Sequence, residues 1–169
     1  YRNNLVSLIN ILELMPKHGV KGIIFSSSCT VYGQPDVLPV TEAAPIKKAE
    51  SPYGNTKQIN EEIIDDTIAS GSPIKAIKLR YFNPIGAHPS ALIGELPNGV
   101  PQNLVPFLTQ TAMGIREKLS VFGDDYDTPD GSCIRDYIYV VDLAKAHVIA
   151  MNRILEGKQK QPSEVFNVG

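Results

Sequence analysis

Two segments of the chain carry apolar residues at the three- and four-residue spacing of an amphipathic helix. The first predicts a helix over about residues 3–17, which ends before Gly19, a residue suited to a left-handed C-terminal cap. The second predicts a helix over about residues 53–69, because Ser51-Pro52 is a common start signal and Gly71 a stop. The two apolar faces consist of Leu5, Leu8, Ile9, Leu12 and Met15, and of Ile59, Ile63, Ile64 and Ile68.

Short apolar runs alternate with these helices and predict buried strands over residues 21–27 and 74–81. Residues 34–51 between the first strand and the second helix read as a loop. Strands that alternate with helices in this way favour a parallel sheet with crossover helices. The expected fold class is therefore α/β.

The pattern changes after Phe82, where residues 83–103 are rich in proline and glycine and show no periodicity. Loops of this length inside a compact domain are usually functional. Further on we expect a helix over 104–113, strands over 119–122 and 134–141, and a helix to residue 155 that Asp142 caps. A last strand is expected over 165–169. Because the chain begins in a helical pattern and stops in a strand, we expect both ends to be cuts in a longer protein.

Composition narrows the possible functions. The 169 residues are 43% hydrophobic with a formal net charge of −2, which allows an ordinary core and indicates no nucleic-acid partner. We expect no membrane span and no signal peptide, because no apolar run is long enough and no basic start precedes one. A cytoplasmic location is the default for a chain without expected disulfides. No metal is expected, because the candidate ligands are scattered: His18, His88, His147, Cys29 and Cys133.

Tyr53 and Lys57 stand four positions apart on the second predicted helix and therefore share a face. A phenol ordinarily ionises near pH ~10, and a nearby ammonium favours its ionised form. A tyrosine in such a pair can take a proton from a sugar hydroxyl. The spacing alone more often reflects an unrelated surface pair, so its weight depends on the surrounding sequence.

Other polar residues are expected near strand ends, where open α/β sheets bind ligands. The run Ser26–Thr30 could donate hydroxyl hydrogen bonds there or only terminate the strand. Arg80 and Arg135 are also placed near strand ends, and Arg135 could bind a phosphate or pair with Asp136 or another acid. Asn83 before proline could bind a carbonyl or amide, or only form a turn. No G-x-G-x-x-G run occurs, and both His88 and His147 read as structural or exposed.

Five stretches of the chain together form a recognisable pattern. They are Phe25-Ser-Ser-Ser-Cys-Thr-Val-Tyr-Gly33, Ser51-Pro-Tyr-Gly-Asn-Thr-Lys57, Leu79-Arg-Tyr-Phe-Asn-Pro-Ile-Gly-Ala-His-Pro89, Gln102-Asn-Leu-Val-Pro106 and Arg135-Asp-Tyr-Ile138. With them, the chain resembles the UDP-glucose 4-epimerase family, within the extended short-chain dehydrogenase/reductase superfamily, over essentially its whole length. The Tyr-x-x-x-Lys pair indicates only the superfamily, whereas the run from Asn83 to Pro89 indicates this family.

The resemblance implies an α/β fold in two parts. Residues 1–83 would be the C-terminal half of a Rossmann-like NAD-binding domain. Residues 84–169 would be mainly the UDP-sugar region, with 134–169 partly returning to the sheet.

The resemblance also implies the site residues. The implied catalytic residues are Ser28, Tyr53 and Lys57, with Tyr53 as the base. Tyr53 and Lys57 would also contact NAD, together with Asn3 and Phe82, while Ser28 would contact the UDP-sugar together with Asn83, Asn103, Leu104, Ser120, Val121, Phe122 and Arg135.

The implied reaction interconverts UDP-glucose and UDP-galactose through a 4-keto sugar with bound NAD, in galactose metabolism. The resemblance also implies a homodimer formed by helices 3–17 and 53–69. The family's glycine-rich phosphate loop and the residue that limits sugar size have no counterpart here, so the 169 residues alone are expected to be inactive. Cys29 stands where the family commonly has alanine, and Tyr139 where it has histidine.

Three alternatives stay open. A sugar-nucleotide 4,6-dehydratase would need carboxylates where this chain has Cys29-Thr30. A steroid-type dehydrogenase would not need the nucleotide-binding set of Asn83, Asn103 and Arg135. A non-catalytic remnant that only retains UDP-sugar or subunit contacts would not need an intact Ser28, Tyr53 and Lys57.

Overall fold

The computed structural model describes residues 1–169, which form two compact units. The first unit comprises Tyr1–Phe82 and Lys145–Gly169, and the second comprises Asn83–Ala144. The helix α4, Val140–Leu155, begins in the second unit and continues in the first. The assignment of residues 1–83 and 84–169 to cofactor and substrate regions stays a prediction.

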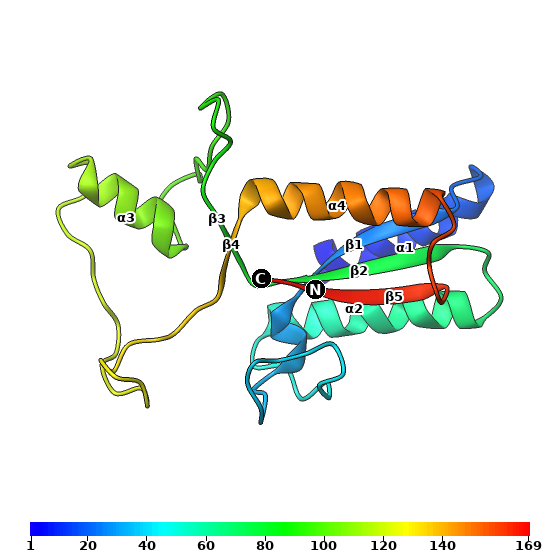
Figure 1. Cartoon of the computed structure of the whole chain (residues 1–169), viewed down its shortest axis with the longest axis horizontal. Coiled ribbons are helices and arrows are strands. Elements are labelled where there is room, and N and C mark those ends of the chain that lie inside the picture. Colours follow the sequence, from blue (N-terminus) through cyan, green and yellow to red (C-terminus); the bar gives the residue numbers. More distant parts are fainter. The chain divides into compact units, whose positions relative to one another are not determined.

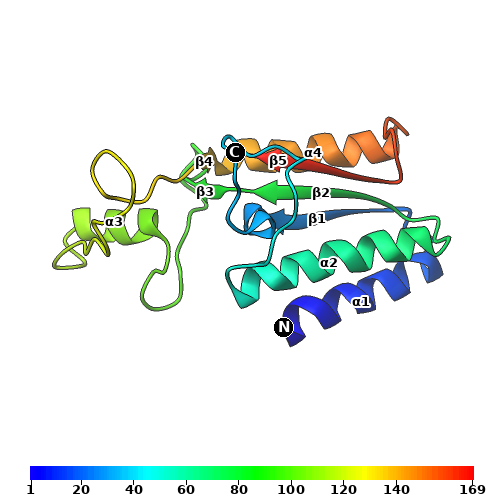
Figure 2. The ribbon, with the colours of Figure 1, turned by 90° about the horizontal axis from the view of Figure 1, so that it is seen from below.

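The first unit is built on a parallel sheet, which confirms the expected α/β class. Its strand order is β1-β2-β5, formed by β1 (Gly22–Ser28), β2 (Lys75–Tyr81) and β5 (Ser163–Val168). Two helices, α1 (Arg2–Lys17) and α2 (Pro52–Ala69), lie on one face of this sheet, and α4 lies on the other (Figures 1 and 2). A short 3-10 helix, η1 (Cys29–Tyr32), follows β1 directly and was not predicted.

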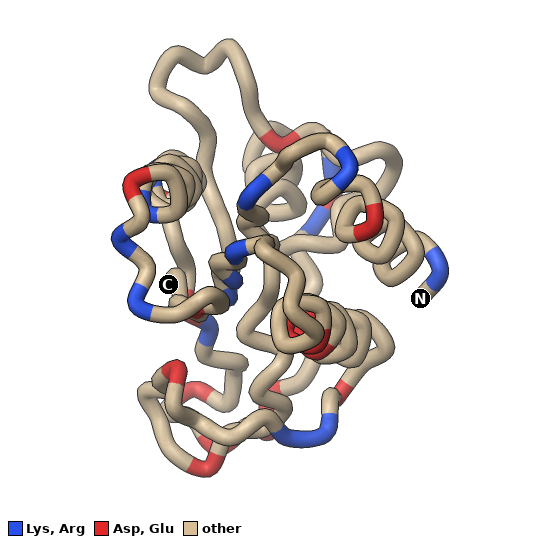
Figure 3. Tube along the Cα trace, turned by 90° about the vertical axis from the view of Figure 1, so that its right-hand side faces the viewer, with Lys and Arg blue, Asp and Glu red and all other residues tan.

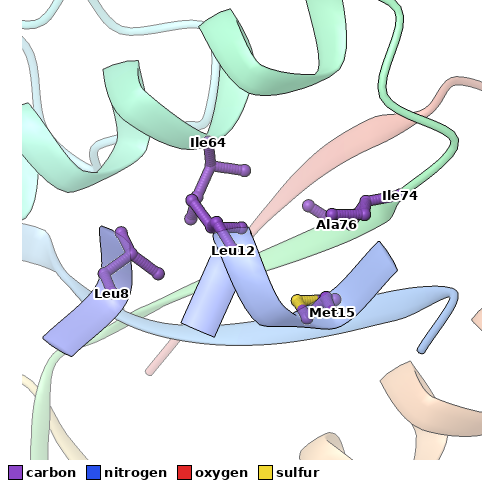
Figure 4. Packing of buried hydrophobic residues seen from close by; sticks show 6 residues of the cluster. All are labelled: Leu8, Leu12, Met15, Ile64, Ile74 and Ala76. Atoms are coloured by element: carbon purple, nitrogen blue, oxygen red, sulfur yellow. The ribbon is translucent and has the colours of Figure 1, made fainter. Parts of the chain in front are cut away.

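The core of the first unit lies on both faces of the sheet, because successive strand residues point to opposite sides. On one face α1 and α2 pack on the sheet through the buried side chains of Leu8, Leu12, Met15, Ile64, Ile74 and Ala76 (Figure 4). On the other face Ile77 and Leu79 of β2 pack against Ala150 of α4. The predicted apolar faces of both helices are thus largely confirmed, although Ile9 remains 38% exposed.

The second unit has little regular structure. The two short strands β3 (Asn83–Ile85) and β4 (Tyr137–Tyr139) pair in parallel, and α3 spans Leu104–Ala112. The predicted strand over 119–122 is wrong, because this segment has no neighbouring strand with which to pair. The strand predicted over 134–141 is shorter than expected, because its partner β3 has only three residues and α4 begins at Val140. Asp142 lies within the first turn of α4 rather than before it.

Basic and acidic residues alternate over most of the chain, but the stretch 123–131 carries four aspartates and no basic residue (Figure 3). None of the helices combines the length and apolar character needed to cross a membrane. No group of three or more His, Cys, Asp or Glu side chains is arranged to hold a metal ion.

Candidate active site

The start of α2 presents Tyr53 to solvent beside the carboxyl end of β1. Ser51 caps this helix, because its side-chain oxygen accepts a 3.1 Å hydrogen bond from the backbone N–H of Gly54. The absence of a side chain at Gly54 lets the start of α2 pack closely against the segment that follows β1. A Cβ atom at this position would lie 3.2 Å from the carbonyl oxygen of Thr30. Tyr53, in the first turn, is 51% exposed. Its phenol is therefore accessible to a bound molecule.

Lys57 lies one turn further along α2, and the structure places its ammonium close to Tyr53. The Nζ atom is 5.5 Å from the centroid of the Tyr53 ring and 5.1 Å from that of Phe25. It donates a 2.7 Å hydrogen bond to the carbonyl oxygen of Ser26. Partial burial lowers the pKa of Lys57, because the charged form loses hydration. The predicted Tyr53–Lys57 pair is thus a spatial pair on one helix face.

Ser28, the last residue of β1, is buried two residues beyond Ser26, whose carbonyl oxygen binds Lys57. Its Oγ accepts hydrogen bonds from the backbone N–H of Thr30 at 3.3 Å and the Thr30 hydroxyl at 3.0 Å. The hydroxyl of Ser28 thus caps η1 and is not hydrogen-bonded to Tyr53. An incoming hydroxyl or carbonyl could accept the proton that Ser28 does not use in these bonds.

A second polar group lies on the α4 face of the sheet and includes two residues that the sequence analysis did not bring together. The Oη atom of Tyr81 donates a 2.7 Å hydrogen bond to Ser26 Oγ and lies 2.6 Å from His147 Nε2. Burial raises the pKa of Tyr81, and the hydrogen bond with Ser26 opposes this in part. Tyr81 ends β2, and strand alternation places Ser26 and Ser28 on one face, which is the sequence signal that could have found part of this group.

Arg80, considered for a strand-end role, faces the opposite side of the sheet and is buried in an ion pair with Glu61. Its Nη2 atom lies 2.6 Å from Oε2 of Glu61, and its Nε donates a 3.0 Å bond to Oε1. Its Nη1 donates to the hydroxyl of Tyr32 at 2.8 Å. All these donors are directed to protein groups, so Arg80 has a structural environment rather than a ligand-binding one.

The two further residues predicted to contact NAD lie in the first unit. Asn3 is exposed in the first turn of α1, and its carbonyl oxygen accepts from the Ser7 hydroxyl. Phe82 follows β2 and donates its backbone N–H to the carbonyl oxygen of Val168 at 3.1 Å.

The ammonium of Lys57 has three N–H donors and uses one of them in its hydrogen bond to Ser26, which leaves two for another partner. This donor set, beside an exposed phenol, fits the hydroxyl groups of a nucleotide ribose.

The residues predicted to surround the UDP-sugar lie in the second unit, apart from Ser28. Asn83 donates its backbone and side-chain N–H groups to the carbonyl oxygen of Asp136, at 3.1 and 2.7 Å, so it lies next to the Arg135 segment. The Nη1 of Arg135 donates to the Ile134 carbonyl oxygen at 2.9 Å, and its guanidinium does not pair with Asp136. These two predicted residues are therefore neighbours.

The other predicted substrate residues are exposed and are not gathered with Asn83. Asn103 precedes α3 and donates to Oε1 of Glu95 at 3.1 Å beside a cavity of about 350 Å³. The remaining ones make no contact that assigns them a role, and Val121 and Phe122 are 76% and 87% exposed. They are Leu104, Ser120, Val121 and Phe122.

A cavity of about 870 Å³ in the first unit lies at the other end of the sheet. It is lined by Gly22 and Lys75, which begin β1 and β2, and by Ile154 and Leu155 of α4. Because ligands of open α/β sheets bind at the carboxyl ends of the strands, this cavity is not part of the candidate site.

Comparison with known proteins extends these observations. The family model described as NAD dependent epimerase/dehydratase family matches residues 1–169. The chain is 51% identical to a UDP-glucose 4-epimerase of Dictyostelium discoideum and 50% identical to that of Homo sapiens, over 100% of this chain and 48% of each relative. A crystal structure of UDP-glucose 4-epimerase from Bifidobacterium longum in complex with NAD+ and UDP matches with a TM-score of 0.93 and 48% identity. That match covers 100% of this chain and 49% of the other. The chain thus spans about half the length of these relatives.

Proposed function

Because this chain belongs to the NAD dependent epimerase/dehydratase family, we propose that it is part of an enzyme that interconverts UDP-glucose and UDP-galactose. The observation that carries the proposal is the Tyr53–Lys57 pair beside Ser28 at the carboxyl end of β1. Relatives named UDP-glucose 4-epimerase support the substrate pair, and the related structure with NAD+ and UDP supports the ligand classes. The alternative dehydratase reaction lacks support, because Cys29 and Thr30 follow Ser28 where carboxylates would be needed.

In the proposed reaction Tyr53 handles the proton of the sugar 4-hydroxyl. Its exposed phenol can reach a bound sugar, and the Lys57 ammonium 5.5 Å from its ring favours the phenolate by Coulomb attraction. The phenolate takes the hydroxyl proton as C4 is oxidised and returns it when the 4-keto sugar is reduced from the opposite face. Bound NAD supplies the hydride acceptor and donor. Ser28 donates a hydrogen bond to the sugar oxygen and orients it towards Tyr53.

Lys57 has a second proposed role in holding the cofactor. Its two remaining N–H donors would bind the ribose hydroxyls next to the nicotinamide, with Asn3 and Phe82 as further contacts. Binding of the uracil, diphosphate and sugar is assigned to the second unit. Within it, Arg135 would hold the diphosphate through its forked donors. The other contacts would come from Asn83, Asn103, Leu104, Ser120, Val121 and Phe122.

A kinetic experiment tests the proposed function. In a protein of the relatives' full length that carries these 169 residues, Tyr53→Phe should lower kcat for UDP-galactose by about 10²- to 10⁴-fold. Its KM should change little, because the phenol acts on the proton rather than on the nucleotide. Tyr139→Phe is the control, since Tyr139 is also partly exposed, its hydroxyl donates to the carbonyl oxygen of Ala87, and it is assigned no part in the proposed site. An unchanged rate in Tyr53→Phe would overturn the assignment.

The proposed assembly is a homodimer formed by α1 and α2, in the cytoplasm. The apolar side chains that α1 leaves exposed support this, since exposed apolar surface of this kind suits a subunit interface. They are Val6, Ile9, Ile11 and Leu14, exposed by 38–49%. Light scattering of the full-length protein tests the proposal, and a monomer at micromolar concentration would contradict it. Replacing Ile11 with Glu should shift the equilibrium to monomer.

A further inference from the structure

We propose that Tyr81 and His147 are positioning residues for Lys57, and that they act through Ser26. The proposal deepens the proposed function and rests on it, because Lys57 is the ammonium that serves Tyr53 there. Neither Tyr81 nor His147 belongs to the predicted catalytic set. Both lie in the first unit, at the carboxyl end of β2 and on α4.

Three hydrogen-bond contacts link the four residues across four elements, and within Ser26 the link from side chain to carbonyl group is covalent. His147 Nε2 of α4 lies 2.6 Å from Tyr81 Oη of β2, which lies 2.7 Å from Ser26 Oγ of β1. The carbonyl oxygen of Ser26 then accepts the 2.7 Å hydrogen bond from Lys57 Nζ of α2. The series therefore joins the α4 face of the sheet to the ammonium beside Tyr53.

The number of available protons limits the arrangements of this series. A phenol has one proton, so it can donate to Ser26 or to His147 but not to both. With the bond donated to Ser26, the Nε2–H of His147 donates to the phenol oxygen. The side chains of Ser26 and Tyr81 are then both held in one orientation. The tilted contact between the rings of His147 and Tyr81, 5.6 Å between centroids, fixes the phenol further.

Lys57 needs such support, because its ammonium stands on a flexible four-carbon chain. The protein groups around it are the Ser26 carbonyl, the Phe25 ring and the Tyr53 ring, and the first two belong to the end of β1. That part of β1 is in turn attached to β2 through the side chains of Ser26 and Tyr81. Displacement of catalytic groups by about 1 Å can reduce a rate about 100-fold. Loss of the Tyr81 hydroxyl should therefore change the position of the Lys57 ammonium, although Tyr81 does not contact Lys57.

The kinetic test uses the full-length protein described above. In Tyr81→Phe and in His147→Leu, kcat should fall about tenfold, with the KM for UDP-galactose unchanged. The acid limb of the kcat–pH profile should also move to higher pH, since a displaced ammonium supports the phenolate less. His147→Gln keeps an N–H donor near Tyr81 and should restore most of the rate. The double variant of Tyr81→Phe and His147→Leu should be no worse than either single one.

Lys78→Met is the control for a general loss of stability. Lys78 is more buried than these two residues and hydrogen-bonds Asp65 on the other face of the sheet, at 2.7 and 2.8 Å. This variant should lower the free energy of unfolding but leave the acid limb in place. If Tyr53→Phe is inactive while Tyr81→Phe keeps both kcat and the acid limb, the positioning role is wrong. If Tyr53→Phe is active, the proposed function itself fails.

A second measurement needs no activity. The Cε resonance of Lys57, followed by NMR against pH, reports the pKa that burial lowers. In Tyr81→Phe this pKa should rise towards the ordinary lysine value, because the ammonium swings into water. An unchanged titration of Lys57 in both Tyr81→Phe and His147→Leu would overturn the inference even if either variant loses activity.

Discussion

Arg80 and Glu61 form a two-bond ion pair between β2 and α2, with side chains that are 7% and 8% exposed. Burial by itself would lower the pKa of Arg80, but the hydrogen bonds and charge of Glu61, helped by Tyr32, raise it. Glu61 also accepts from the Ser27 hydroxyl. Through these bonds the helix that carries Tyr53 and Lys57 is fixed to two strands of the sheet.

Removing one partner of this pair should be costly. In Arg80→Met the Glu61 carboxylate is left buried without its cation, and the free energy of unfolding should fall by about 3–5 kcal/mol. Urea denaturation measures this change. Lys47→Met is the control, because Lys47 pairs with the exposed Asp36 and its loss should cost about 1 kcal/mol or less. Adding Glu61→Leu to Arg80→Met should recover much of the lost stability, and a further fall would contradict the ion-pair explanation.

The N-terminal cap of α2 gives a second prediction. Ser51→Ala removes the acceptor for the Gly54 N–H and should lower the free energy of unfolding by about 1 kcal/mol. Tyr53 lies in the turn that this cap holds, so kcat of the full-length protein should fall as well. Ser51→Asp keeps an acceptor oxygen and should leave both values near those of the original protein. Equal effects of Ser51→Ala and Ser51→Asp in denaturation and kinetics would show that the cap is unimportant.

The sequence predicts those features whose causes are local. The start of α2 is fixed by Ser51-Pro52, and its apolar spacing indicates the packed face, so helix and boundary are both confirmed within one residue. The segment 119–122 has apolar character but no strand partner. Whether a segment pairs as a strand depends on residues that are far away in the sequence. This is why a strand was predicted there and is absent.

The candidate site divides in the same way. Tyr53 and Lys57 are close because helical spacing places them on one face, which a sequence reveals directly. The partners Tyr81 and His147 are 66 positions apart, and only the packing of α4 on the sheet brings them together. Arg80 is similar: its place near a strand end was foreseen, whereas its burial against Glu61 depends on the register of α2 over β2.

The pair of Glu164 and Arg153 predicts a pH dependence of stability. Arg153 lowers the pKa of Glu164 through hydrogen bonds of 2.6 and 2.8 Å, an effect that burial partly opposes. Because the folded pKa lies below the unfolded one, the stabilisation is complete above the ordinary carboxyl pKa of about 4.3 and is lost as pH falls through the folded value. Denaturation of Glu164→Gln should therefore show a shallower loss of stability over this acid range. Parallel curves for the two proteins would contradict the assignment.

Arg135 gives the sharpest prediction for the second unit. If its guanidinium binds the diphosphate, Arg135→Ala should raise the Kd for UDP about 10- to 100-fold in calorimetric titration of the full-length protein. Arg135→Lys keeps the charge but loses the forked donors, so its Kd should lie between the two.

Arg116→Ala is the matched control within the same unit. The guanidinium of Arg116 is held by a 2.8 Å hydrogen bond to Gln110 and lies 4.8 Å from the centroid of the Phe107 ring, so it is already engaged. Its removal should leave the affinity for UDP unchanged. Arg135 has only the carbonyl oxygen of Ile134 as a protein acceptor and keeps its other donors for a ligand. Equal weakening by both alanine variants would indicate a general charge effect, and no weakening by Arg135→Ala would remove Arg135 from the site.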